Sequence, residues 1–476
     1  MARINTNVES LIAQQGLANS QKSLDTSLQR LSTGLRINTG ADDPAGLIAS
    51  DGLKSEIAGI NSAVSNSSRA VNVISTAEGA LNEVSNLLLN IKGLVVQSAN
   101  SGALSTDEIA ANQLQVDSAV QSITRIANTT TFAGQSLLNG SLDYVTSGVN
   151  TAQIKSLDIS QTNFGTNSTL PVQVNVVTSA KTAGLEFVAS SVAHSVTLQI
   201  SGNQGTQVLT FTSGTAASAI AYAVNGISDT TGVTAKVNSL ATAASGITFQ
   251  STGYGSKSFV SVTAQSGVFN TVDTAGTART RTVGQDAVAT INGAETVGDG
   301  LDLHINTNAL NMNLTLSNTF GAGKTSFAIT GGGALFQLGA QVNSNQQVNI
   351  GIGSVAANSL GDNNVGFLNQ IVTGGNATLV NGQSETASQI VDTAISQVAI
   401  LAGRLGAFQQ NTLETNTNSL NVALENVTSS ESDITDADFA AETSNLTRAQ
   451  ILTQAGTSVL ATANSTPQNV LSLLGH

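Results

Sequence analysis

The chain has 476 residues, of which 40% are hydrophobic and only 10% charged, with a formal net charge of −13 and no cysteine. Such a length allows two or three domains with packed cores. The negative charge makes nucleic acid and anionic membrane poor partners, and the lack of cysteine excludes disulfides and thiolate chemistry.

The first part of the chain has the apolar spacing of long helices. Residues 5–35 predict one helix, with leucines spaced by four, three and four residues at Leu24, Leu28, Leu31 and Leu35. Asp43 and Pro44 then predict a second helix start, because an acid can cap it and proline suits its first position. That helix carries an apolar stripe to Val95, which Ser67 is predicted to interrupt.

Ser105 and Glu108 have the spacing of a capping box and predict the start of a third helix. From about Tyr144 the pattern changes to the alternation of half-buried strands, as in residues 172–176, 196–200 and 208–211. This β-rich region is predicted to extend to about Gly333 and to contain one short helix at 217–227.

Helical spacing returns after residue 384, where Ser384 is predicted to cap a helix. A polar stretch at 429–435 predicts a break, and Thr435 with Asp438 is predicted to cap a final helix. Both ends of the chain thus carry apolar helical stripes, which is typical of a polymer subunit rather than of a catalyst. Because an isolated helix is marginal in water, we expect the outermost helices to become ordered on assembly.

Residues with catalytic chemistry are scattered. The three histidines, His194, His304 and His476, have no metal-ligand spacing. Asp42 and Asp43 are better explained as helix-start caps than as catalytic carboxylates. We therefore expect no enzyme, cofactor or metal site. Residues 1–15 show no cleavable secretion signal, and no apolar run approaches the roughly 18 residues of a membrane span.

Motifs at both ends resemble bacterial flagellin. They are LSTGLRIN at 31–38, DDPAG at 42–46, SNLTRAQIL at 444–452 and PQNVL at 467–471. The resemblance covers roughly residues 1–140 and 335–476. It implies an α+β protein whose long terminal helices form an α-helical coiled-coil core around a central β-rich inserted domain.

The resemblance also implies a domain order. Residues 1–42 and 435–476 would be the two parts of an inner-tube helical domain, and residues 43–145 and 334–434 the two parts of an outer-tube domain. Residues 146–333 would be a variable, β-rich surface domain.

The implied function is that of a structural subunit that polymerises into the flagellar filament for swimming. The implied partners are other copies of the chain, hook-junction and cap proteins, and an export chaperone with its export apparatus. The filament would be extracellular and exported without signal cleavage. The alternatives are a hook–filament junction or filament-cap protein, or a secreted adhesin. The residues predicted to pack in the polymer are Leu24, Leu28, Leu31, Leu35, Ile451, Leu452, Val459 and Leu471.

Flagellins are also ligands of an animal innate immune receptor. The family segment for this reads QRVRELAVQ, whereas here it reads Leu89, Asn90, Ile91, Lys92, Gly93, Leu94, Val95, Val96 and Gln97. Asn90 and Gly93 replace an arginine and a glutamate, which removes charge-assisted hydrogen bonds. We therefore predict weak receptor activation.

Overall fold

The computed structural model describes residues 6–165, 167–238 and 246–474, with side chains described up to residue 466 at the C-terminal end. Its contacts divide the chain into two units. The first unit comprises residues 1–68, 338–342 and 413–476, and the second comprises residues 69–337 and 343–412.

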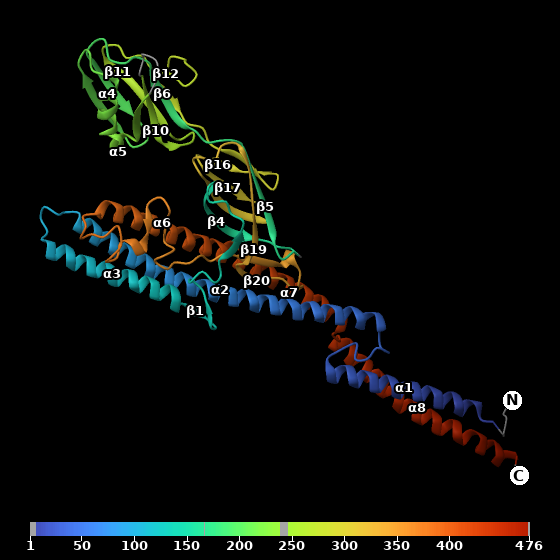
Figure 1. The fold of residues 1–476 in the computed structure, drawn as a ribbon. Helices are drawn as coiled ribbons and strands as arrows, with labels where there is room; N and C mark the ends of the chain where they lie inside the picture. The colour runs from blue at the N-terminus through green and yellow to red at the C-terminus, as the bar shows by residue number, and fades with distance from the viewer. Residues whose placement is uncertain (1–5, 166, 239–245, 475–476) are drawn as a thin grey trace. The chain divides into compact units, whose positions relative to one another are not determined.

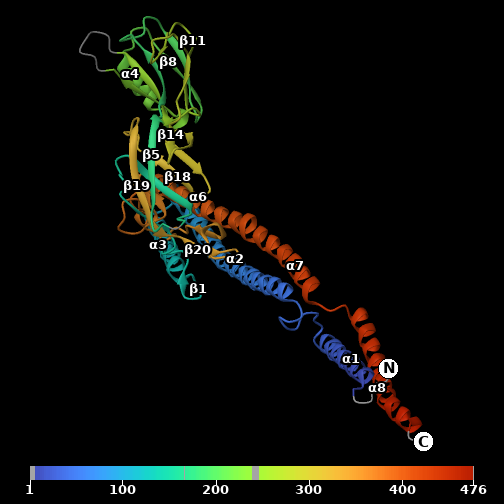
Figure 2. The same cartoon turned by 90° about the vertical axis from the view of Figure 1, so that its right-hand side faces the viewer.

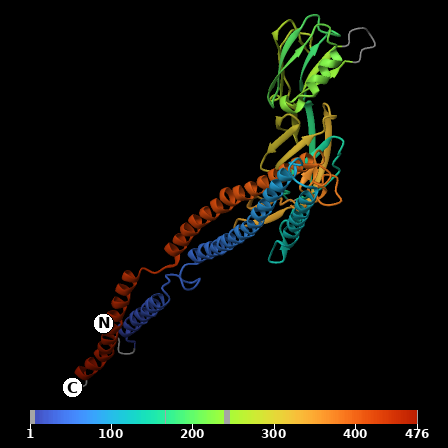
Figure 3. The same cartoon turned by 90° about the vertical axis from the view of Figure 1, so that its left-hand side faces the viewer.

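The first unit contains the two terminal helices, α1 (Val8–Thr33) and α8 (Phe439–Leu474), which lie side by side and antiparallel (Figures 1, 2 and 3). Asn7 caps α1 by accepting from the Ser10 amide at 3.0 Å. The same asparagine donates to the Ala463 carbonyl at 2.7 Å. Gly34 ends α1 with a φ of 75°, a left-handed conformation that glycine adopts at little cost.

The chain segments that follow α1 and precede α8 pair with each other. The Arg36 amide donates to the Thr435 carbonyl at 2.6 Å, and the Ala437 amide donates to the Gly34 carbonyl at 2.9 Å. The Arg36 guanidinium also donates to the Ile434 carbonyl at 2.5 Å. This short antiparallel bridge holds the segment that follows α1 against the segment that precedes α8.

Beyond the bridge the first unit continues with the start of α2 (Pro44–Ser98) and with α7 (Thr415–Thr435). Glu431 connects them, since it accepts from the Ser50 hydroxyl at 3.1 Å and lies 3.4 Å from the Lys54 ammonium. The predicted start of α2 is confirmed, because Asp43 accepts from the Gly46 amide at 2.9 Å.

The buried face of α2 is a continuous heptad seam. Its buried members run at alternating spacings of three and four from Ile60 to Ser98. The predicted interruption at Ser67 is wrong. Ser67 is fully buried in the seam, and alanines occupy the positions between the large apolar residues: Ala63, Ala70 and Ala77.

The helical part of the second unit contains the rest of α2, α3 (Thr106–Thr129) and α6 (Ser384–Phe408). The predicted capping box is confirmed, with the Ser105 amide donating to Glu108 at 2.8 Å and the Glu108 amide donating to the Ser105 hydroxyl at 3.3 Å. Lys92 on α2 forms an ion pair with Asp392 on α6 at 2.6 Å.

Two predicted helix boundaries are wrong. Ser384 is the first residue of α6 and not its cap, which is Gln383 and makes no side-chain cap bond. The polar stretch 429–435 is helical, because the Thr435 hydroxyl bonds back to the Glu431 carbonyl at 3.0 Å rather than leaving the helix. The break falls after it, and Asp438 alone caps α8, accepting from the Ala440 and Ala441 amides.

The helical stretch Ser384–Thr435 is apolar enough to cross a membrane by length and composition alone, with a mean hydropathy of 1.3 in its most apolar window. This corrects the expectation that no segment would reach that limit. The π-helical turn η3 (Gln409–Glu414) continues α6 into α7, and the stretch is longer than its sequence pattern indicated because residues 429–435 are also helical. Its apolar residues include fully buried core positions such as Ile390, Val391 and Leu405, and such a helix passes the same test in a soluble core.

The second unit also contains a β module, called the proximal module, with two antiparallel sheets around one core. Tyr144 lies in this core, where its hydroxyl donates to the Asn349 carbonyl at 2.9 Å and burial raises its pKa to about 12. One sheet has the order β15 (Ala294–Glu295), β14 (Val288–Ile291), β5 (Leu170–Thr178), β19 (Gly323–Gly332) and β3 (Tyr144–Ser147). The other has the order β16 (Val297–Asp299), β17 (Asp302–Asn306), β18 (Leu310–Leu316), β4 (Ile154–Thr162), β21 (Gln347–Ile350) and β20 (Ala334–Gln337).

A second module, called the distal module, is inserted between β5 and β14. Its two four-stranded antiparallel sheets share one core with α4 (Ala217–Asn225), and α5 (Ser228–Thr231) follows α4. One sheet has the order β12 (Val272–Asp273), β6 (Thr182–Phe187), β10 (Ile247–Tyr254) and β9 (Val233–Val237). The other has the order β13 (Arg281–Val283), β11 (Phe259–Ser266), β7 (Val196–Ser201) and β8 (Thr206–Phe211).

Short elements complete the second unit. They are β1 (Thr131–Phe132), β2 (Gln135–Ser136), η1 (Ser344–Gln346), β22 (Gly361–Asp362), β23 (Gly366–Phe367) and η2 (Leu368–Gln370). The predicted fold class, α+β with helical ends around a β-rich insertion, is confirmed. The strands predicted at 172–176 and 196–200 alternate between buried and less buried side chains as expected. The strand at 208–211 is more exposed because β8 lies at a sheet edge.

Candidate functional site

The contact between α1 and α8 follows a strict heptad pattern. On α1, buried or half-buried positions recur every seven residues at Ser10, Leu17, Leu24 and Leu31. On α8 they recur every seven residues at Glu442, Ala449, Gly456 and Ala463. A seam of this kind keeps one face of each helix against its partner over many turns.

Large residues of α1 face small residues of α8. A Cβ atom added to Gly456 would lie 3.2 Å from the Leu17 Cδ1 atom. The same antiparallel register places Leu24 opposite Ala449, which is only 4% exposed. Small side chains on one helix let the other helix approach closely, because the distance between helix axes depends on the residues at the contact.

A buried polar cluster lies at the end of this seam where α1 ends and α8 begins. Glu442 is 7% exposed and accepts from the Ser27 hydroxyl at 2.5 Å. The Arg30 guanidinium lies 3.7 Å from the other Glu442 oxygen. A buried carboxylate is tolerated when it is paired and hydrogen-bonded. Sequence reasoning missed this cluster, although the spacing of Glu442 seven residues before Ala449 placed it on the seam.

The residues predicted to pack in a polymer lie mostly beside the seam rather than in it. Leu24, Leu31 and Leu35 are half-buried, and the side chain of Leu471 lies outside the described residues. The others are exposed in the single chain: Leu28 by 48%, Ile451 by 62%, Leu452 by 50% and Val459 by 57%. Leu11 and Ile12 of α1, which the sequence did not single out, are also exposed. These exposed residues of α1 and α8 are called the outer apolar face below.

A groove of about 570 Å³ lies between α1 and α8, beside the buried cluster. Lys22, Arg30 and Arg448 line it, together with Glu442 and neutral polar residues. Three cations against one carboxylate give this groove a positive charge, although the chain as a whole is acidic.

The segment predicted to meet the immune receptor lies on α2 in the second unit. Ile91 and Val95 are buried, whereas Asn90 and Gly93 are exposed. Lys92 donates to both the Ser388 hydroxyl and the Asp392 carboxylate at 2.6 Å. The one cation that the segment keeps is therefore held against α6.

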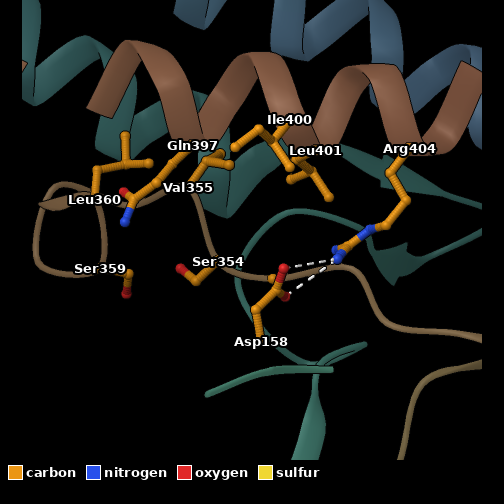
Figure 4. Close-up of a pocket in the computed structure, with 10 residues that line it drawn as sticks. Asp158, Ser354, Val355, Ser359, Leu360, Gln397, Ile400, Leu401 and Arg404 are labelled. Atoms are coloured by element: carbon orange, nitrogen blue, oxygen red, sulfur yellow. Dashed lines mark hydrogen bonds and ion pairs between the residues drawn. The ribbon is translucent and has the colours of Figure 1, made fainter. Parts of the chain in front are cut away.

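A smaller cavity of about 240 Å³ lies where α6 approaches β4 (Figure 4). Arg404 points from α6 toward Asp158, and its Nη1 lies 3.1 and 3.2 Å from the two carboxylate oxygens. Arg404 also donates to the Ser160 hydroxyl and to the Gly351 carbonyl. The charged groups of this cavity thus bind each other and join the helical part to the proximal module.

Two of the remaining candidate residues, Asp42 and His304, have structural contacts, and His476 lies outside the described residues. Asp42 accepts from the Thr39 amide at 2.8 Å and from the Asn38 amide at 3.1 Å, which lowers its pKa. His304 bonds to the Asn313 side chain at 2.6 Å across two strands. Within the described part of the chain, no group of three or more histidine and acidic side chains is placed to hold a metal ion.

Comparisons with known proteins agree with this architecture. The bacterial flagellin N-terminal helical region matches residues 4–143, and the bacterial flagellin C-terminal helical region matches residues 388–474. The chain is 32% identical to B-type flagellin from Pseudomonas aeruginosa and 31% identical to flagellin from Salmonella typhimurium, over 99% of each chain in both cases.

Solved structures show weaker similarity. FliC from Burkholderia pseudomallei is 16% identical with a TM-score of 0.24, covering 72% of this chain and 99% of its own. The hook-associated protein HAP-3 from Legionella pneumophila is 14% identical with a TM-score of 0.31, covering 81% and 98%. The sequence similarity over the full chain identifies the family. The chain belongs to the bacterial flagellins, the structural subunits that polymerise into the extracellular flagellar filament for swimming motility.

Proposed function

We propose that copies of this flagellin pack through the outer apolar face of α1 and α8. The observation that carries the proposal is that the heptad seam is filled within one chain, while Ile12, Ile451 and Val459 beside it remain 57–65% exposed. Burying a large apolar side chain contributes about 1.5–3 kcal/mol. Large apolar residues exposed along both terminal helices are candidates for an interaction surface.

The groove beside the seam would be covered in the same packing. Arg30 is already paired with Glu442, so Lys22 and Arg448 then need counter-charges, because an unpaired buried charge is strongly destabilising. Carboxylates of a neighbouring copy would supply them. Assembly is therefore expected to weaken at high salt, which screens the attraction before the groove closes.

The domain order proposed for the filament places residues 1–42 and 435–476 in an inner tube, and residues 43–145 and 334–434 in an outer tube. Two hydrogen bonds support this division, one between Arg36 and Thr435 and one between Ala437 and Gly34. They join the segment after α1 to the segment before α8, which is where the proposed inner-tube and outer-tube parts meet. Residues 146–333 would face solvent. A chain that lacks them should still polymerise.

The deciding experiment is electron microscopy after seeded assembly of the purified protein. The full chain should form long tubular filaments, and a chain trimmed of residues 1–40 and 440–476 should remain monomeric. Short rings or caps from the full chain would contradict a filament subunit and favour a junction or cap protein.

A pair of point variants locates the packing surface. Ile451→Asn removes one residue of the outer apolar face, and Gln450→Asn introduces the same side chain at the neighbouring exposed position. The first variant should raise the critical concentration for assembly by roughly tenfold, as the loss of one buried apolar side chain implies. The second should change it little. Equal effects would reject the outer apolar face as the packing surface.

Export is proposed to occur through the flagellar secretion channel without cleavage of a signal, assisted by a chaperone that holds the C-terminal helix. The support is the unpaired apolar face of α8, which a chaperone would cover before assembly. Mass spectrometry of secreted filaments tests the first point, since a cleaved signal would shorten the N-terminus. Co-purification tests the second point: the chaperone should co-purify with the full chain but not with a chain that lacks residues 440–476.

The proposed immune recognition is weak. Exposed Asn90 and Gly93 lack the charges of the usual family segment, and Lys92 is paired with Asp392. The double variant Asn90→Arg with Gly93→Glu should raise receptor reporter activity in cells. Glutamate fits at position 93, because nothing lies within 4 Å of a Cβ atom placed there. A wild-type response as strong as that of a typical flagellin would contradict the proposal.

The protein is proposed to act mechanically and not as an enzyme. The support is that its charged groups are used in contacts between elements, as in the Arg404–Asp158 pair and the Ser27–Glu442 bond. A hydrolytic activity that co-purifies with the filament and disappears on single substitution of one of its side chains would refute this.

A further inference from the structure

The distal module has the opposite charge to the rest of the chain. Between β5 and β14 the five cations are Lys181, Lys236, Lys257, Arg279 and Arg281, and the four acids are Glu186, Asp229, Asp273 and Asp286. Five minus four gives +1 for this module, whereas the whole chain is −13. A local reversal of charge of this kind points to an anionic partner.

Three of the five cations line one cleft. It has a volume of about 560 Å³ and lies between the start of β6 and the segment from Asp273 to Gln285. Lys181, Arg279 and Arg281 line it, with threonines, glycines and Gln285 between them. It is a shallow cleft that is open to solvent rather than an enclosed cavity.

The walls of the cleft are fixed by backbone contacts. Lys181 and Gln285 exchange two backbone hydrogen bonds of 2.8 and 2.9 Å. The Thr282 hydroxyl donates to the Gly184 carbonyl at 2.9 Å. Position 284 must be glycine, because a Cβ atom there would lie 2.4 Å from the Gly255 carbonyl oxygen. Lys181 and Arg281 are thus carried on hydrogen-bonded backbone, and Arg279 lies in the turn between β12 and β13.

The charges in the cleft are only partly neutralised. The one lining carboxylate, Asp273, accepts from Arg279 Nε at 2.8 Å and from two backbone amides of its own turn. The Arg281 guanidinium lies 4.3 Å from the centre of the Phe259 ring, a cation–π contact that orients it and leaves its charge in place. Within the described part of the chain, Lys181 has no ion pair.

We propose that this cleft binds an acidic saccharide, with its carboxylate on Arg281 and Lys181 and its hydroxyls on the threonine and glutamine side chains. A guanidinium matches a carboxylate with two parallel hydrogen bonds. No aromatic side chain lines the cleft, so it lacks the stacking surface that single-stranded nucleic acid requires. Because every copy in the filament carries the cleft, weak single sites would add up to strong attachment to a polymer of acidic sugars.

The test is calorimetric titration of the full-length monomer with an oligogalacturonate. Arg281→Gln and Lys181→Gln should each weaken binding by roughly tenfold or more, as the loss of a charge-assisted hydrogen bond implies. Lys236→Gln, which removes an exposed lysine of the same module that does not line the cleft, is the matched control and should change affinity less than about twofold. Arg281→Lys should restore part of the affinity.

Titrations with other ligands test whether the cleft prefers an acidic saccharide to other anions. A neutral oligogalactoside should not bind, and inorganic phosphate or an oligothymidylate should bind more weakly than the oligogalacturonate. Absence of oligogalacturonate binding, an equal loss in Lys236→Gln, or equal binding of oligothymidylate would overturn the proposal. Circular dichroism and thermal melting of each variant separate loss of binding from loss of folding.

Discussion

The paired terminal helices and the distal module place their apolar side chains differently. In the distal module Leu185, Leu198 and Phe249 are fully buried in one core that both sheets share. On α1 and α8, Ile12 and Ile451 remain more than 60% exposed, and the buried seam consists largely of small or polar residues. The module therefore completes its core within one chain, whereas the helices leave large apolar residues exposed. In the packing proposed above, other copies would cover these residues.

The largest expected effect is in the closed core. Phe249→Ala removes a fully buried ring that packs edge-on against Phe269, with ring centres 6.1 Å apart. It should destabilise the distal module by about 3–5 kcal/mol. Hydrogen exchange of the β10 amides in the monomer measures this, and filament formation should persist. A loss below about 1 kcal/mol would show that the core is not closed.

A smaller effect is expected in the helical seam. Gly456→Leu places a side chain against Leu17, which a Cβ atom would already approach to 3.2 Å. Overpacking should weaken the α1–α8 pair by about 1–3 kcal/mol. Gly16→Leu is the control, because nothing lies within 4 Å of a Cβ atom at that position. Amide exchange along α1 in the monomer should rise for the first variant only, and equal exchange in both would argue against the close seam.

The same substitution, valine to threonine, at Val260 and at Val459 tests the comparison between the closed core and the exposed helix surface. Val260 on β11 is fully buried, whereas Val459 on α8 is 57% exposed. Val260→Thr buries a hydroxyl and should cost about 1–3 kcal/mol. Val459→Thr should change monomer stability by less than about 0.5 kcal/mol but hinder assembly. Urea unfolding of the monomers and the critical concentration for polymerisation measure the two effects, and a large monomer loss for Val459→Thr would place it inside the seam.

The smallest effect concerns pH and the loop between α1 and α2. The pKa of Asp42 lies below its usual 3.8, first because of the Thr39 backbone amide and then because of the Asn38 amide and the Thr39 hydroxyl. Since the folded pKa is lowered, this contribution is present above the usual value and lost as pH falls through the folded one. Protection of the Thr39 amide, relative to its intrinsic exchange rate at each pH, should therefore fall as the pH drops below the usual 3.8. Asp42→Asn should remove this pH dependence, and an unchanged profile in the variant would exclude Asp42 as its cause.

Local signals in the sequence predicted local structure well. The capping box of Ser105 and Glu108 and the cap at Asp43 involve residues three positions apart, so neighbouring residues are enough to define them. Ser384 and the stretch 429–435 were interpreted wrongly because serine and threonine also bond within a helix, as Thr435 does to the Glu431 carbonyl.

The leucine stripe of α1 shows what a spacing pattern alone misses. Leu24 and Leu31 lie on the seam, but Leu28 is 48% exposed. Counting large apolar residues does not distinguish such exposed positions from those that face Ala449 and Gly456 on α8. Whether a residue of a given size fits at a position depends on the residue that faces it on the other helix. The sequence does not specify which residue that is.

The sequence by itself determined the order of helices and strands, the family and the need for partners at both ends, because apolar periodicity and terminal motifs are properties of neighbouring residues. Only the tertiary structure decided which positions fill the α1–α8 seam and which stay exposed in the single chain. It also brought Lys181 and Arg281, which are 100 positions apart, to one cleft. The physical reason is that the register between distant segments depends on packing across the fold, and a single strand or helix carries no record of what lies opposite.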